Sequence, residues 1–183
     1  NLEFKQTLQF IVVIINNHYR YPNFFQKIEI VLHYLSNRIK TIFTNAEIFD
    51  IFKSSKRLLL FLIKEKILIL DMSIVKQMKT RYFSPEIKEF IKNHCNDQEI
   101  ATLKLRKYIL NNLPNNFDEN RKNGENENYI CKLIREDSIE DFIIYINKEN
   151  YSFNSQIKPS IFETNLLLYK NNPRLIEYAV FYD

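Results

Sequence analysis

Hydrophobic residues recur along the first part of the chain at the spacing of amphipathic helices. Between residues 2 and 15, one stripe is predicted to contain Phe4, Leu8, Ile11 and Ile15. Pro22 ends this segment, because the residue before a proline avoids the α region. A second helix follows, and its predicted buried face contains Phe24, Ile28, Val31, Leu32 and Leu35.

Capping patterns predict where the next helices begin. Thr44 is followed three residues later by Glu47, which is the pattern of a capping box. Ser84-Pro85-Glu86 combines a cap, a first-turn proline and an acid that favours the positive end of the helix dipole. The predicted starts are Thr44, Ser54 or Ser55, Asp71, Ser84 and Asp97.

The segment 129–148 predicts a helical hairpin. Ile130, Leu133 and Ile134 share one face of its first helix. Asp137, with Glu140 three residues on, predicts the cap of the second helix, and Ser138 is an alternative cap. The second helix is expected to bury Ile139, Phe142, Ile143 and Ile146. Because only a short turn separates the two helices, they should pair antiparallel.

Residues 172–179 resemble a degenerate form of the ankyrin signature Thr-Pro-Leu-His-x-Ala. Pro173, Leu175 and Ala179 match its framework, whereas Asn172 replaces the threonine and Ile176 the histidine. The proline is expected at the first helical position. The residues assigned to this ankyrin-like signature are Pro173, Leu175, Ile176, Tyr178 and Ala179.

Further segments are similar to a protist family of ankyrin-repeat proteins. They are Lys56–Ile63, Phe83–Lys88, Arg121–Asn126, Tyr129–Cys131, Asp137–Phe142, Ser160–Asn165 and Leu175–Ala179. That family couples a helical amino-terminal region of unknown function to an ankyrin array. The resemblance implies protein binding and supplies no catalytic residue. Further repeats would be expected beyond Asp183, so we expect this chain to be a fragment.

The predicted fold is all-α: an irregular helical bundle or α-solenoid leading into a degenerate ankyrin-like helix pair. A single glycine among 183 residues disfavours folds with many tight β-turns. The expected division is a helical region over 1–112, a polar linker over 113–128 and an ankyrin-like unit over 129–183. Partner contacts are expected on the 149–171 connection, and the last helix is expected to expose Leu175, Ile176, Ala179 and Val180.

The charge pattern leaves a second function open. The formal net charge is +4, and acidic and basic residues are mostly interleaved. The densest basic group consists of Lys53, Lys56, Arg57, Lys64 and Lys66. With nearby aromatic residues, such a group can bind nucleic acid or an anionic membrane surface. This basic surface is the alternative to a protein-interaction module.

No pattern in the sequence predicts a catalytic, cofactor or metal site. His94 and Cys95 are adjacent, and adjacent helical side chains point apart. The carboxylate pairs Glu136-Asp137 and Glu140-Asp141 coincide with a predicted helix start, where capping explains them. Cys95 and Cys131 are expected as buried free thiols in a reducing compartment.

The sequence thus predicts a non-catalytic protein–protein interaction module with an unidentified protein partner. We expect an intracellular, cytoplasmic location and no membrane-spanning segment. The run Phe10–Ile15 contains six apolar residues, against the ~20 that a spanning helix needs. The oligomeric state does not follow from the sequence.

Overall fold

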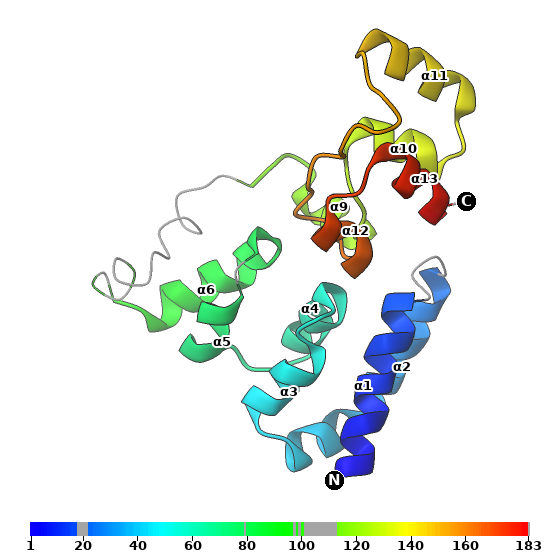
Figure 1. The fold of residues 1–183 in the computed structure, drawn as a ribbon. Helices are drawn as coiled ribbons and strands as arrows, with labels where there is room; N and C mark the ends of the chain where they lie inside the picture. Colours follow the sequence, from blue (N-terminus) through cyan, green and yellow to red (C-terminus); the bar gives the residue numbers. More distant parts are fainter. Residues whose placement is uncertain (18–21, 79, 97, 99, 101–112, 183) are drawn as a thin grey trace. The chain divides into compact units, whose positions relative to one another are not determined.

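The computed structural model describes residues 1–17, 22–78, 80–96, 98, 100 and 113–182. Every regular element in these ranges is a helix, which confirms the all-α prediction (Figure 1). The chain divides into two compact units, Asn1–Pro114 and Asn115–Asp183. Each unit has its own hydrophobic core.

The first unit is a set of short and medium helices around a large apolar core. Its elements are α1 (Leu2–Asn17), α2 (Pro22–Ile42), α3 (Asn45–Phe52), α4 (Lys56–Lys64), α5 (Met72–Gln77), the 3-10 helix η1 (Arg81–Phe83) and α6 (Ser84–His94). Helix α1 packs against α2 and α3, and α3 packs against α4. The largest fully buried side chains here are Tyr82, Phe25, Phe52 and Phe83.

Two of the predicted caps form in this unit. The Thr44 side chain accepts a hydrogen bond from the Glu47 backbone N–H, and the Glu47 carboxylate accepts one from the Thr44 backbone N–H at 2.9 Å. The hydrogen bond from the Thr44 backbone is the main reason that the pKa of Glu47 is lowered. Asp71 accepts from the Ile74 N–H at 2.9 Å and so caps α5. Ser55 occupies the N-cap position of α4 without a side-chain hydrogen bond to the helix.

Other local expectations for the first unit were wrong. Ser84 is the first residue of α6, and Phe83 takes the cap position because η1 runs directly into the helix. Val31, expected in the core, is 41% exposed. The buried stripe of α2 follows Phe25, Leu32 and Ile39, and Val31 lies one position, roughly 100° of helix rotation, away from it. The helix expected from Asp97 lies largely outside the described residues.

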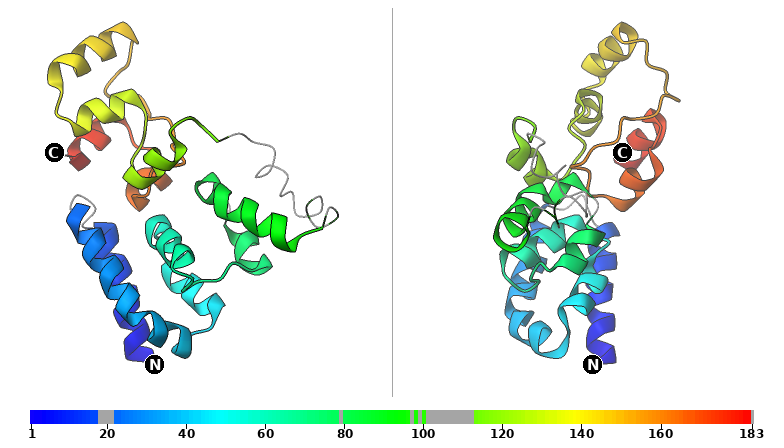
Figure 2. Two further views of the ribbon diagram at one scale, coloured as in Figure 1. Left: turned by 180° about the vertical axis from the view of Figure 1, so that it is seen from behind. Right: turned by 90° about the vertical axis from the view of Figure 1, so that its left-hand side faces the viewer.

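The described residues of the second unit form five helices: α9 (Phe117–Asn123), α10 (Tyr129–Arg135), α11 (Ile139–Lys148), α12 (Leu166–Asn171) and α13 (Leu175–Tyr182). Helices α10 and α11 form a hairpin, and α13 packs against α10 (Figure 2). The core between them contains Ile130, Cys131, Ile157, Leu168, Leu175 and Tyr178.

The stretch 113–128, expected to be a polar linker, contributes structure to the second unit. It contains α9, and the buried ring of Phe117 lies edge-on to that of Phe162 at 5.3 Å between centroids. Gly124 ends α9 with a φ of 71°, a left-handed conformation that glycine adopts without steric cost. The Gly124 carbonyl accepts from the backbone N–H of Thr164 at 3.0 Å. The second unit therefore begins before the predicted hairpin.

Backbone hydrogen bonds tie the 149–171 connection to the start of α13. The Ile157 N–H donates to the Pro173 carbonyl at 2.9 Å, and the Leu175 N–H donates to the Ser155 carbonyl at 3.0 Å. The Ile176 N–H donates to the Phe153 carbonyl at 3.1 Å. These bonds fix where α13 begins relative to the hairpin.

Candidate functional site

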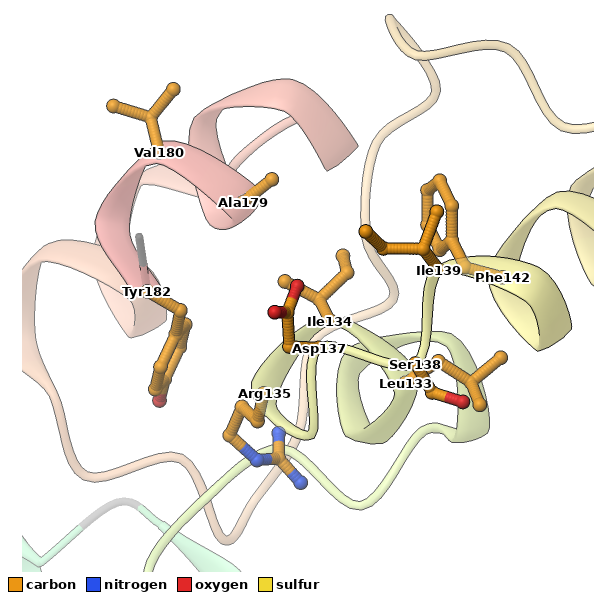
Figure 3. Close-up of a pocket in the computed structure, with 10 residues that line it drawn as sticks. All are labelled: Leu133, Ile134, Arg135, Asp137, Ser138, Ile139, Phe142, Ala179, Val180 and Tyr182. Carbon is orange, nitrogen blue, oxygen red and sulfur yellow. The ribbon is translucent and has the colours of Figure 1, made fainter.

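An open groove of about 420 Å³ lies between the α10–α11 hairpin and α13 (Figure 3). The hairpin side is lined by apolar atoms of Ile134, Ile139 and Phe142. The α13 side is lined by Ala179 and Val180. All of these residues belong to the second unit, so the groove lies within one compact body.

The turn that shapes the groove is a Schellman motif at the end of α10. The Ser138 N–H donates to the Leu133 carbonyl at 3.0 Å, and the Asp137 N–H donates to the Ile134 carbonyl at 3.2 Å. Asp137 has a φ of 52°, a left-handed conformation in which aspartate is enriched among non-glycine residues. The prediction that Asp137 caps α11 was therefore wrong, because it closes the preceding helix. Ser138 takes the cap position, and its hydroxyl donates to the Asp141 carboxylate at 3.0 Å.

Helix α11 leaves much of its apolar face exposed. Ile139, Ile143 and Ile144 are 63%, 49% and 64% exposed, which contradicts the expected burial of Ile139 and Ile143. Phe142 and Ile146 are partly buried against the second core. The reason is that the seven-residue α10 covers only one side of α11. Of these three exposed isoleucines, Ile139 lines the groove.

The ankyrin-like signature residues divide between the core and the surface. Pro173, Leu175 and Tyr178 are buried, whereas Ala179 is half-buried and Ile176 is exposed. Helix α13 begins at Leu175, so Pro173 lies before the helix and not at its first position. Exposure of Leu175 was also predicted wrongly, because its side chain packs in the second core. Val180, by contrast, is 71% exposed at the groove.

A partly buried polar network around Arg135, which lines the groove, joins α10 to α13. The Arg135 guanidinium pairs with the Glu125 carboxylate at 2.9 Å and donates to the Tyr178 hydroxyl at 2.7 Å. It also donates to the Asn126 carbonyl at 2.9 Å. Sequence reasoning missed this network, since Arg135 and its hydrogen-bond partner Tyr178 lie 43 residues apart.

Glu163 and Cys131 lie buried near this network. Burial raises the pKa of Glu163 to about 7, against the opposing effects of the Asn165 N–H bond and the Arg135 charge. Burial likewise raises the pKa of the Cys131 thiol to about 12. A thiol with a raised pKa is a poor nucleophile, so Cys131 acts as a packing residue.

Asp137 supplies the carboxylate among the described residues that line the groove, and further acids lie close to it in the sequence. Residues 136–141 include four acids, Glu136, Asp137, Glu140 and Asp141. Glu136 lies 3.8 Å from Lys132. Figure 3 shows the Asp137 carboxylate between the hairpin and α13, and in the described part of the chain it forms no hydrogen bond or ion pair.

The residues of the predicted basic group do not form one exposed basic surface. Lys56 is buried, and its ammonium lies 5.7 Å from the centroid of the Tyr82 ring. The Arg57 guanidinium lies 3.9 Å from the centroid of the Phe25 ring. Lys53 is exposed and pairs with Asp50 at 2.9 Å, whereas Lys64 and Lys66 lie at the other end of α4.

The described residues contain neither a cluster of metal-binding side chains nor a helix able to cross a membrane. In that part of the chain, no three His, Cys, Asp or Glu side chains come together as metal ligands would. Nor does any helix described there combine the length and apolar character that crossing a bilayer requires. The His94 ring stacks on Phe90 of its own helix at 4.8 Å.

The comparisons with known proteins identify no relative. No model of a known protein family matches this chain, and no curated protein or solved structure matches it either. The similarity to the protist ankyrin family, drawn from sequence segments, therefore stays a prediction.

Proposed function

We propose that this chain is a non-catalytic protein–protein interaction module and that the groove beside α13 is its contact surface. The observation that supports this most is the apolar border of the groove, where Ile139 and Val180 are both mainly exposed. Contiguous exposed apolar surface in a folded protein marks interaction sites. A volume of about 420 Å³ also falls in the range of binding pockets.

The walls of the groove are held in place before any partner arrives. The hydrogen bond from Arg135 to Tyr178 connects α10 to α13, and the Schellman turn sets the angle between α10 and α11. A preformed surface loses little conformational entropy on binding, which favours affinity. The ankyrin-like arrangement of a helix pair followed by α13 fits the same role.

Binding of nucleic acid or an anionic membrane through the basic group is the competing function. It is supported less well, because Lys56 is buried and Arg57 packs on an aromatic ring. Such binding would weaken steeply as salt is raised, whereas contacts in an apolar groove would not.

Affinity capture with matched variants of the whole chain tests the proposal. The native chain, Val180→Lys and Leu167→Lys serve as baits, with washes at low and then high salt. Leu167 is a suitable control because it is 57% exposed on α12 and does not line the groove. We expect a protein that survives high salt, is lost with Val180→Lys and is kept with Leu167→Lys.

Two results would contradict the proposal. One is a set of bound proteins that is the same for all three baits. The other is nucleic acid retained at low salt and released at high salt without any salt-resistant protein, which would favour the basic group. Circular dichroism of each bait shows whether the helical fold is kept.

A further inference from the structure

We infer that the occupant of the groove is an amphipathic helix of a partner protein, with a Lys or Arg beside its apolar face that pairs with Asp137. This inference rests on the proposed function and names the chemistry of the partner.

The walls favour a helix over an extended peptide. An extended peptide binds by adding to a sheet edge with free backbone groups. Here the groove lies between α11 and α13, whose backbone groups are largely used within the helices. The isolated bridge between Gln156 and Arg174 is formed by residues that do not line the groove. Apolar side chains projecting from one face of a helix, at i, i+3 or i+4, and i+7, suit such a groove.

The charge of the groove favours a basic partner. Asp137 projects its carboxylate into the groove from a left-handed turn residue that belongs to neither flanking helix. Helix capping can explain Glu140 and Asp141 in the first turn of α11, but it does not explain Asp137. The nearby cations are engaged, since Arg135 pairs with Glu125 and Lys132 lies against Glu136.

A partner without a cation at this point would leave Asp137 covered and unpaired. Burying an unpaired carboxylate is costly, so neutral or acidic helices are disfavoured. A basic side chain at the edge of the apolar face removes that cost and complements the acidic segment 136–141. The groove therefore selects for charge as well as for apolar anchors.

Two synthetic helical peptides test the inference directly. Both have about 14 residues and the same leucine pattern, and they differ only in Lys or Glu at the flanking positions. Binding to the full chain is measured by fluorescence anisotropy at a fixed salt concentration. We expect the Lys peptide to bind about 10-fold tighter than the Glu peptide, a ratio typical of one close charge pair.

Variants assign that preference to specific side chains. Asp137→Asn removes the charge and tolerates the left-handed conformation of this turn residue. It should reduce the preference to about 3-fold or less, and Asp137→Lys should reverse it. Glu149→Lys changes an exposed carboxylate at the far end of α11 and should leave the preference unchanged. Val180→Lys should weaken binding of both peptides.

The inference is overturned if the Lys peptide does not bind, or if both peptides bind equally to the native chain. A preference unaffected by Asp137→Lys also overturns it. A concentration-dependent dimer in sedimentation that Val180→Lys dissociates would identify a second copy of this chain as the occupant instead. If lysate capture requires Val180 but ignores Asp137→Lys, the proposed function stands and only the basic-helix inference fails.

Discussion

Glu163 offers the sharpest quantitative test of the second unit. Its side chain is 2% exposed, and its Oε1 accepts a hydrogen bond from the Asn165 N–H at 2.8 Å. Burial raises its pKa to about 7, from an ordinary value of 4.5. Replacing it by glutamine keeps an oxygen that can accept the Asn165 bond and removes the ionisable group.

The raised pKa makes the free energy of unfolding depend on pH in a defined direction. Between pH 4.5 and about 7, the folded chain keeps a proton on Glu163 that the unfolded chain has released. The contribution of Glu163 to the free energy of unfolding is therefore largest below pH 4.5. It falls as the pH rises to about 7 and does not change further above that pH. At about 1.4 kcal/mol per pH unit, the total loss is about 3 kcal/mol.

The assay compares Glu163→Gln with the native chain by hydrogen exchange at several pH values from 4.5 to 8. Exchange in peptides covering 124–135 and 160–168 reports on the second unit alone. Comparing the two proteins at each pH cancels the pH dependence of intrinsic exchange. We expect the advantage of Glu163→Gln to grow by about 3 kcal/mol up to pH 7 and then to level off.

Glu119→Gln is the matched control, since it removes an exposed carboxylate from the same unit. Its effect is subtracted to isolate the contribution of burial. If the difference in unfolding free energy between Glu163→Gln and the native chain does not change with pH, the reasoning is refuted. Such a result would mean that the pKa of Glu163 is the same in the folded and the unfolded chain. If the advantage of Glu163→Gln becomes smaller as the pH rises, the pKa of Glu163 is lowered in the folded chain and the predicted direction is wrong.

Three further predictions concern stability and reactivity. Arg135→Met should destabilise the second unit by about 3 kcal/mol in urea unfolding, because a largely buried side chain loses its ion pair and two hydrogen bonds. A loss of stability below about 1 kcal/mol would contradict this prediction. Asp71→Ala should cost about 1 kcal/mol by removing the cap on the Ile74 N–H, whereas Asp71→Asn should cost less. In a thiol titration of the folded chain, half-buried Cys95 should react, whereas fully buried Cys131 should react only in denaturant. If the folded Cys95→Ser variant still has one rapidly reacting thiol, that thiol is Cys131 and the prediction is wrong.

The amino-acid sequence by itself determined the features that depend on short-range bonds. The capping box of Thr44 and Glu47 and the cap of Asp71 on Ile74 each span three residues, so spacing alone predicts them. The helical period likewise predicted the helix over residues 2–15 and the burial of Leu8 and Ile11.

Tertiary structure decided which apolar faces are covered. The period of α11 is the same whether its neighbour is long or short, so it could not reveal that Ile139 and Ile143 stay exposed. Leu175, expected at the surface of an uncapped last helix, is instead buried in the core with Ile157 and Tyr178, which local sequence does not specify.

Charge and turn geometry at the groove also came from the tertiary structure. From the sequence, Asp137 could cap α11 or end α10. The hydrogen bonds from the Asp137 and Ser138 N–H groups to the Ile134 and Leu133 carbonyls show that it ends α10. Arg135 and Tyr178 are 43 residues apart, and only packing of α13 on α10 brings them within 2.7 Å. Local patterns thus predicted many of the helices but not α9 or α12, which lie in the expected linker and connection. Contacts distant in sequence created the groove, because burial depends on neighbours that periodicity does not specify.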